Sequence, residues 1–439
     1  MSTMSPGAAR RVSLVVDLGF GDAGKGLVTD WLVRRDGAGL VVRYNGGAQA
    51  GHNVVTPEGR HHTFAQVGAG AFVPGVRTWL AHPFVLHPTA LLVEAEALRA
   101  QGVPDALERL GISERARVIT PFHQALNRLR ELARGEARHG SCGVGVGETV
   151  RDALDFPEDT LRAGDLRDVP RLSRVLARVR ERKREEARAL ALPDSEPVRR
   201  ERALLDTDGV SDAWAERAAR VAPRVREDGQ LGAWMRATRA TVFEGAQGVL
   251  LDEDWGFHPF TTWSRCTLAN ALALLADAGV EADVQRVGVL RGHAVRHGAG
   301  PLPTAAPELQ PLVAEHNQRN AWQGGVRLGW FDAVLARYAL DVVGGVDALV
   351  LTHLDLLGQL RTWKACVAYG ATSRLPVPAA PSLDTQARLA RWLEGVTPTW
   401  ETCAPREDAV LPLVERLLGR SVDWVSRGPC ATNVAARPP

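Results

Sequence analysis

Short apolar runs recur along the chain and predict β-strands. They cover residues 12–17, 40–44, 78–81, 117–119, 241–244, 284–290 and 348–352. Several of these runs contain consecutive apolar residues and no regular alternation with polar ones, which is typical of strands in a sheet that is covered on both faces. Between them, residues 171–191 form a basic amphipathic pattern and residues 210–240 are largely helical in pattern. The order of elements therefore predicts an α/β architecture.

Composition agrees with a large globular protein and excludes several other classes. Of the 439 residues, 45% are hydrophobic and 24% are charged, so the chain can bury a large core. The net charge of +2 gives no reason to expect nucleic acid or membrane as a partner, and the arginines of 171–191 are interpreted as a solvated helix face. The five cysteines lack any CxxC spacing, and the N-terminus lacks the pattern of a signal peptide. We expect reduced thiols and a cytoplasmic protein.

The most informative motif follows the first predicted strand. It reads Gly19-Phe-Gly-Asp-Ala-Gly-Lys-Gly26, which nearly matches a phosphate-binding loop, in which backbone N–H groups and one lysine cradle phosphates. Gly26 stands where such loops carry the Ser or Thr that binds Mg²⁺. Asp22 is the candidate replacement, because hard cations prefer carboxylate oxygens and a carboxylate beside a phosphate can also accept a proton.

Further segments extend the pattern over most of the chain. They are Arg43-Tyr-Asn-Gly-Gly-Ala-Gln-Ala-Gly-His-Asn53, Phe243-Glu-Gly-Ala-Gln-Gly248, Arg296-His-Gly-Ala-Gly-Pro-Leu-Pro-Thr304 and Gly329-Trp-Phe-Asp332. Together with the first loop, in this order, they resemble the adenylosuccinate synthetase family, whose members join IMP to aspartate at the expense of GTP.

This resemblance implies a complete architecture. We expect a large central, mostly parallel β-sheet flanked by helices, with a GTP site like a P-loop. Residues 1–439 should form a single domain of this type, with a helical region at about 167–240 inserted in the α/β core. The family also implies a homodimer.

The resemblance assigns roles to the two glycine-rich loops. Asp22 would accept the N1 proton of the purine, and His52 would stabilise the transferring phosphoryl group and act as an acid. The cofactor is expected to be Mg²⁺, with Asp22 and Gly51 as its ligands. The GTP phosphates are expected at Gly21, Gly24, Lys25, Gly26, Gly51 and Asn53.

Guanine recognition is predicted at two later positions. Thr352-His-Leu-Asp355 resembles the T-K-x-D motif, in which one carboxylate accepts both N1–H and the exocyclic amine of guanine. Asp355 supplies that carboxylate, while His353 replaces the usual lysine. A second contacting loop is expected at Ser426, Gly428 and Pro429. Adenine lacks this pair of donors and would leave the acid without partners, so GTP should be preferred.

The acceptor side departs from the family pattern. In Ser141-Cys-Gly-Val-Gly-Val-Gly-Glu148, Cys142 and Val144 replace a threonine and an arginine of the loop that holds the IMP phosphate. A run of four arginines in the aspartate loop is reduced to Arg327, and a dicarboxylate needs guanidinium forks for bidentate recognition. The candidate acceptor-binding residues are Gln49, Cys142, Gln247, Thr262 and Arg327.

Three hypotheses remain open from the sequence. The chain is an adenylosuccinate synthetase with substitute arginines, a ligase of the same GTP-dependent chemistry with a different oxo acceptor or amine, or a GTP-binding protein without ligase activity. The pairing of Asp22 with His52 disfavours the third hypothesis.

Overall fold

A ten-stranded sheet forms the centre of the computed structural model, which describes residues 10–138, 140–313, 319–320 and 322–437. In spatial order its strands are β20 (Val434–Ala436), β19 (Trp424–Ser426), β16 (Ala348–Thr352), β11 (Ala282–Arg291), β1 (Arg10–Asp17), β10 (Ala240–Glu244), β2 (Leu40–Arg43), β5 (Arg77–Leu80), β7 (Leu110–Ser113) and β9 (Val225–Arg226). Neighbouring strands are parallel except for β19 and β20. The predicted α/β fold with a large, mostly parallel sheet is confirmed.

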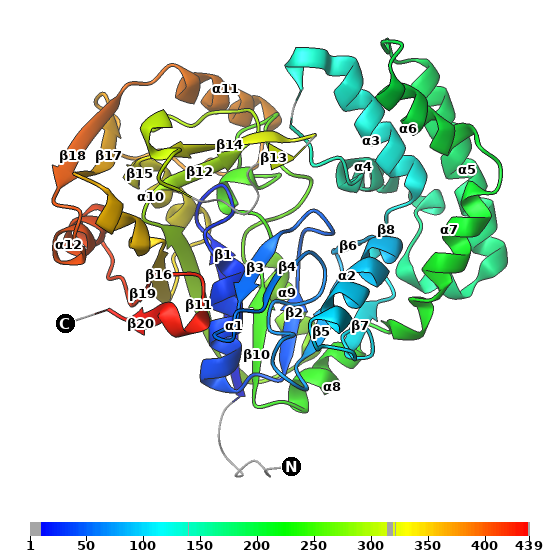
Figure 1. Ribbon diagram of the computed structural model, residues 1–439, viewed down its shortest axis with the longest axis horizontal. Coiled ribbons are helices and arrows are strands. Elements are labelled where there is room, and N and C mark those ends of the chain that lie inside the picture. The colour runs from blue at the N-terminus through cyan, green and yellow to red at the C-terminus, as the bar shows by residue number, and fades with distance from the viewer. Residues whose placement is uncertain (1–9, 139, 314–318, 321, 438–439) are drawn as a thin grey trace.

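Helices flank the sheet. They are α1 (Lys25–Asp36), α2 (Pro88–Ala100), α3 (Pro121–Arg134), α4 (Val146–Asp155), α5 (Val169–Arg188), α6 (Glu196–Asp206), α7 (Val210–Ala219), α8 (Gln230–Arg236), α9 (Ala269–Ala278), α10 (Ala333–Val342), α11 (Leu383–Glu394) and α12 (Glu407–Leu418). Helices α3 to α7 gather on one side of the molecule, while α10, α11 and α12 lie on the opposite side with the C-terminal strands (Figure 1).

Smaller sheets carry the loops that surround the strand ends. β12 (Ala294–His297) and β13 (Arg319–Asn320) both pair with β14 (Gly324–Gly329). β15 (Phe331–Asp332) and β18 (Pro398–Cys403) pair with β17 (Trp363–Tyr369), β3 (His52–Val55) pairs with β4 (His61–Phe64), and β6 (Val85–Leu86) pairs with β8 (Arg117–Val118).

Two expectations about individual elements were wrong in detail. The strand predicted at 117–119 is only β8 and lies outside the large sheet, in a short pair with β6. The helical pattern at 210–240 is interrupted between α7 and α8, where β9 joins the edge of the large sheet. Pro223 cannot continue a hydrogen-bonded helix, and Val225, which follows it, is fully buried against β7.

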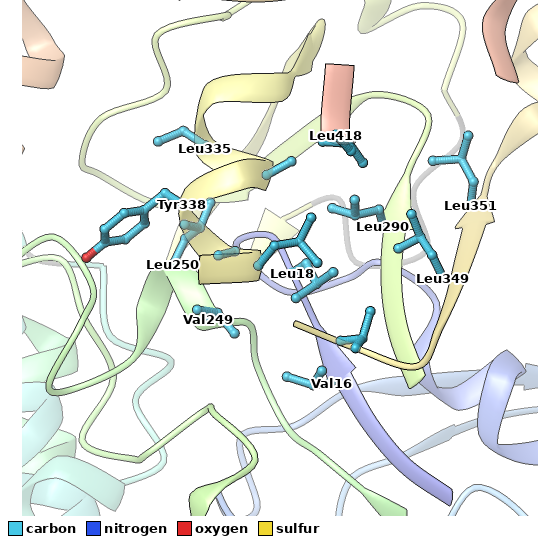
Figure 2. Close-up of a cluster of buried hydrophobic side chains, with 14 of the residues drawn as sticks. Val16, Leu18, Val249, Leu250, Leu290, Leu335, Tyr338, Leu349, Leu351 and Leu418 are labelled. Atoms are coloured by element: carbon cyan, nitrogen blue, oxygen red, sulfur yellow. The ribbon is translucent and has the colours of Figure 1, made fainter. Parts of the chain in front are cut away.

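The core fixes the strand ends from which the site is built. Apolar side chains of β1, β11, β16 and α10 meet in one cluster, in which Leu18 and Leu290 lie between Leu335 and Leu351 (Figure 2). β1 and β16 are buried along almost their whole length, as is the carboxyl-terminal half of β11, so the carboxyl ends of these strands emerge from a rigid support. Loops that leave such strand ends are held in defined positions.

Asp332 is a buried carboxylate that caps helix α10. Its Oδ1 accepts the N–H groups of Val334 and Leu335, and its Oδ2 accepts the hydroxyl of Tyr369 at 2.6 Å. Burial raises the pKa of Asp332 to about 6, although these hydrogen bonds oppose the rise. Because the folded protein holds this proton more tightly than the unfolded chain, the contribution of Asp332 to stability decreases as pH rises from about 4 to about 6.

We expect Asp332→Asn to remove this pH dependence, because asparagine can cap the helix without becoming charged. Relative to the unsubstituted protein, the variant should gain about 2 kcal/mol in unfolding free energy between pH 4.5 and pH 7.5. Urea unfolding at both pH values measures this difference. Asp384→Asn, at an exposed aspartate in the first turn of α11, is the control and should show no such gain. An equal effect of the Asp332 substitution at both pH values would contradict the prediction.

Candidate active site

The first glycine-rich loop connects β1 to α1 in a conformation that needs glycine. Gly21 and Gly24 have φ values of 92° and 91°, and Asp22 also has a positive φ, of 56°. Helix α1 begins at Lys25, and no side chain caps its N-terminus. The N–H groups of its first turn therefore face the loop without a side-chain acceptor. A helix N-terminus of this form is an anion-binding feature.

The second glycine-rich loop packs directly against the first. A Cβ atom on Gly26 would lie 2.8 Å from the backbone oxygen of Asn53 and 2.9 Å from the Cβ of His52. No larger residue fits at this position without moving β3 away from α1. The glycine that replaces the usual Ser or Thr therefore allows His52 to approach the start of α1.

Lys25 is neutralised by a carboxylate that the sequence analysis did not identify. Its Nζ lies 2.8 Å from Oδ2 of Asp17 at the end of β1, and the two side chains are 3% and 0% exposed. The same carboxylate accepts the backbone N–H groups of Gly19 and Ala23. Asp17 therefore organises the loop from inside. The sequence offered one signal for this role, an acid at the last position of a buried strand shortly before the glycines.

Asp22 is the accessible acid of the loop, with a side chain that is 33% exposed. Its Oδ2 lies 2.9 Å from Nε2 of His297, at the end of β12. Burial raises the pKa of Asp22, but the hydrogen bond and charge of His297, together with Lys25 and Arg291, outweigh it and lower the pKa to about 2. The carboxylate is thus ionised and able to bind a cation or accept a proton.

His52 is buried and held by Glu244, the second residue that the sequence analysis missed. Nδ1 of His52 lies 2.5 Å from Oε1 of Glu244, which also accepts the N–H of Ala69 through Oε2. Burial lowers the pKa of His52 against the opposing effect of Glu244. Within the described residues, Nε2 of His52 is buried without a hydrogen-bond partner, so this nitrogen remains available to a ligand.

Asp22 and His52 share one electrostatic neighbour. The positive charge of Lys25 lowers the pKa of both groups. The acid of the first loop and the imidazole of the second therefore both lie near Lys25, on two loops that pack against each other. Their assignment as catalytic groups remains a prediction.

The predicted guanine-binding segments leave adjacent strands at the same edge of the sheet. β16 ends at Thr352 and β19 ends at Ser426, and the two strands are parallel neighbours. Asp355 is exposed on a 3-10 helix that starts at Leu354. Gly428 accepts the hydroxyl of Ser426 through its backbone oxygen, next to the exposed Pro429. This arrangement is compatible with one base-binding surface.

His353 has a different environment from an exposed base-stacking side chain. It has a φ of 60°, and its Nδ1 lies 2.8 Å from the hydroxyl of Thr352. The imidazole packs against the phosphate loop, since a Cβ on Gly24 would lie 3.7 Å from its Cε1. Burial lowers the pKa of His353 well below its usual value, so it is neutral. It therefore links the base-binding edge to the phosphate loop.

Two amides gather where an acceptor purine was predicted. A Cβ on Gly46 would lie 2.9 Å from Oε1 of Gln247, and one on Gly47 would lie 3.0 Å from Oε1 of Gln49. Both amide atoms of Gln49 and Oε1 of Gln247 are buried without a partner among the described residues. Buried amides normally have hydrogen-bond partners, so these groups are suited to a polar ligand. Thr262, the other predicted contact, donates its backbone N–H to Leu251.

Two tryptophans cover the glycine-rich loop that was compared with the IMP phosphate loop. A Cβ on Gly143 would lie 2.6 Å from the indole of Trp322, and one on Gly147 would lie 2.9 Å from the indole of Trp263. Between them the chain enters α4, whose N-terminus has no side-chain cap. Burial raises the pKa of the neighbouring Cys142 thiol, so this side chain is a neutral group in the loop.

Arg327, the remaining arginine of the aspartate loop, binds backbone. It donates from Nε to the oxygen of Gly298 at 3.0 Å and from Nη2 to the oxygen of Gly300 at 2.7 Å. These hydrogen bonds do not test its predicted contact with the amine substrate, which remains a prediction. The upstream residues 314–318 and 321 lie outside the described part of the chain.

Metal binding fits only a site that is completed by substrate. No group of three or more His, Cys, Asp or Glu side chains suited to a metal occurs in the part of the chain that the structure describes. Asp22 supplies one exposed carboxylate, and Gly51 is partly exposed in the second loop. Mg²⁺ commonly binds through one or two carboxylates plus phosphate oxygens and water, which agrees with this sparse set.

Comparison with known proteins identifies the family. The family model of adenylosuccinate synthetase matches residues 14–435. The chain belongs to the adenylosuccinate synthetase family. The adenylosuccinate synthetase of Alkalilimnicola ehrlichii is 33% identical over 432 residues, covering 95% of each chain. Adenylosuccinate synthetase 2 of Chromobacterium violaceum is 33% identical over 434 residues, covering 95% of this chain and 96% of the relative.

Solved structures of the adenylosuccinate synthetase type share the fold. The fully ligated adenylosuccinate synthetase of Plasmodium falciparum has a TM-score of 0.79 at 18% identity, covering 98% of this chain and 100% of that chain. The succinoaminodeoxyadenylate synthetase of cyanophage S-2L, bound to dGMP and dATP, has a TM-score of 0.61 at 20% identity, covering 98% and 96%. Among the described residues, none of the helices has the length and apolarity that crossing a membrane requires.

Proposed function

We propose that this GTP-dependent C–N ligase converts IMP, L-aspartate and GTP to adenylosuccinate, GDP and phosphate through a 6-phosphoryl intermediate. The observation that carries the proposal is the placement of Asp22 and His52 on two touching glycine-rich loops, both within electrostatic range of Lys25. A protein that only binds GTP has no use for this pair.

The geometry suggests a division of labour between the residues. Asp22 accepts the N1 proton of the purine, so that O6 gains the electron density to attack the γ-phosphorus of GTP and release GDP. His52, held by Glu244, faces the phosphoryl group with Nε2 and stabilises its charge. The amine then attacks C6, and the phosphate leaves with the O6 atom. Mg²⁺, held by Asp22, by Gly51 and by substrate oxygens, would neutralise phosphate charge.

A second candidate function is the same chemistry on a different oxo acceptor or amine. It is favoured by Val144 and the two tryptophans that cover the acceptor loop, and by Arg327, whose Nε and Nη2 donate to the backbone oxygens of Gly298 and Gly300. A site that lacks free guanidinium groups binds a dicarboxylate less well, because it cannot form bidentate hydrogen bonds to both carboxylates. The two candidates differ only in what occupies the acceptor side.

Coupled phosphate release distinguishes these functions. Purified protein with Mg²⁺, GTP and IMP should release phosphate when aspartate is added, with adenylosuccinate as the product. Release that requires another purine or amine would replace the first candidate by the second. GTP binding without phosphate release, with every purine and amino acid tested, would remove the ligase assignment.

Asp355→Asn tests the guanine assignment. The amide cannot accept both the N1–H and the amine of guanine, so GTP affinity should fall by about 10- to 100-fold while ATP affinity changes little. Calorimetric titration with each nucleotide measures this selectivity. Asp384→Asn, another exposed aspartate, serves as the control. An unchanged preference for GTP over ATP would contradict the role of Asp355.

Other features of the family remain proposals for this chain. We infer a homodimer, a cytoplasmic location and a chain that works as one domain, with helices α5 to α8 inserted into the α/β core. The shared packing of α3 with α5 and α6 supports a helical layer that begins before residue 167. Sedimentation of the purified protein would test the dimer.

A further inference from the structure

The loop that follows β12 is clamped by two arginines. The buried Arg296 donates from Nε to the oxygen of Ala299 at 3.0 Å and from Nη1 to the oxygen of Pro301 at 2.9 Å. Arg327 donates to the oxygen of Gly298, which precedes Ala299, and to the oxygen of Gly300, which lies between Ala299 and Pro301. Four consecutive backbone oxygens are thus fixed by two guanidinium groups.

The two arginines are themselves held in register. Arg296 and Arg327 are opposite each other in the antiparallel pair of β12 and β14, and His297 is opposite Val326. Arg296 also donates from Nη2 to the oxygen of Phe260, and its guanidinium lies 4.3 Å from the ring centroid of Phe20. The clamp is therefore anchored to the first loop through Phe20 and to the segment around Phe260.

His297 lies between this clamp and the acid of the first loop. It is the last residue of β12, directly before the clamped carbonyls, and its Nε2 lies 2.9 Å from Oδ2 of Asp22. The imidazole is 13% exposed, compared with 33% for Asp22. The carboxylate is thus held from its more buried side and remains open on the other side.

We propose that His297 is a positioning residue of the active site: the arginine clamp fixes its imidazole, and the imidazole orients the Asp22 carboxylate toward the acceptor. This inference rests on the proposed role of Asp22. It needs no change of protonation, because the contact acts through geometry. Asp22 has a backbone conformation that few non-glycine residues adopt, so its side chain benefits from an external support.

The proposal also connects the two halves of the site. β14 is followed by the matched segment ending at Asp332, and it carries Val326 and Arg327 where the family has its aspartate-binding arginines. Movement of β14 when an amine binds would reach Asp22 through β12 and His297. A rigid chain of backbone pairs and one side-chain contact joins the amine side to the proton-accepting side.

His297→Ala and His297→Gln test the proposal together. Alanine removes the support, and we expect kcat for phosphate release to fall about 100-fold while the GTP dissociation constant stays within about twofold. Glutamine can place an amide nitrogen near the position of Nε2, so it should be about tenfold less impaired than alanine. His82→Ala removes an imidazole that contacts the backbone of Arg115 near another strand end, and it should retain full activity.

Crystal structures of the two variants make the test independent of turnover. The Asp22 carboxylate should leave its position near the clamped loop in His297→Ala and return to it in His297→Gln. If the unsubstituted protein releases no phosphate with any acceptor, the proposed function fails, and these structures still decide the positioning role. Normal turnover in His297→Ala, equal impairment of both variants, or an unmoved Asp22 carboxylate would overturn the proposal.

Discussion

Asp22→Asn is expected to lower kcat for phosphate release by about 1,000-fold while GTP affinity, measured without Mg²⁺, changes by less than about twofold. An amide has nearly the same shape as the carboxylate and can still contact Nε2 of His297, but it cannot accept the N1 proton. The purine oxygen would then remain a poor nucleophile toward GTP. Steady-state kinetics and calorimetric titration with GTP separate the two effects.

Asp36→Asn provides a matched control, because Asp36 lies at the opposite end of helix α1 and pairs with Arg11 and Arg35. Its turnover should be unchanged. A variant at Asp22 that retains more than about a tenth of normal turnover would show that another group accepts the proton.

His52→Ala is expected to lower kcat by about 100- to 1,000-fold, because it removes the group that faces the transferring phosphoryl unit. Glu244→Gln should cause a smaller loss, since Nδ1 of His52 would keep a neutral partner in place of a carboxylate. The order of activities is therefore unsubstituted protein, then Glu244→Gln, then His52→Ala. Single-turnover phosphate release with saturating GTP and acceptor measures this order.

The GTP dissociation constant provides the internal control for these variants and should vary by less than about threefold. If the Glu244 variant is as active as the unsubstituted protein, the ion pair has only a structural role. If His52→Ala loses GTP binding together with turnover, the imidazole acts in nucleotide binding and not in the chemical step.

The sequence was sufficient for features that depend on local pattern. Strands such as β1 and β16 are short apolar runs, and their burial on both faces follows from that composition. The glycine-rich loops could also be located, because Gly21 and Gly24 adopt backbone angles that other residues avoid. The predicted catalytic residues Asp22 and His52 could be named because they lie in or next to these loops.

Partners of the nominated residues could not be predicted. His52 and Glu244 are 192 positions apart, and their contact depends on the pairing of β2 with β10 and on the packing of β3 against α1. The contact between Asp22 and His297 depends in the same way on β12. Hydrophobic periodicity specifies which face of an element is buried, but not which side chain of a distant element it will meet.

On the acceptor side, the sequence could identify a residue but not the groups that it contacts. Arg327 could be nominated from its position in a motif, but its hydrogen bonds to Gly298 and Gly300 follow from the register of β12 and β14. Long side chains with several donors can serve a ligand or a backbone loop equally well. Only the folded arrangement of the strands decides between them.

The ion pair between Asp17 and Lys25 changes what an arriving nucleotide encounters. The ammonium already has an anion at 2.8 Å, and both partners are shielded from water. A terminal phosphate must therefore exchange with an internal counter-ion instead of neutralising a bare cation. A singly charged anion such as chloride gains little from this exchange, whereas a polyphosphate carries enough charge to compete. Occupancy of the loop is thereby made selective for highly charged ligands before any base is recognised.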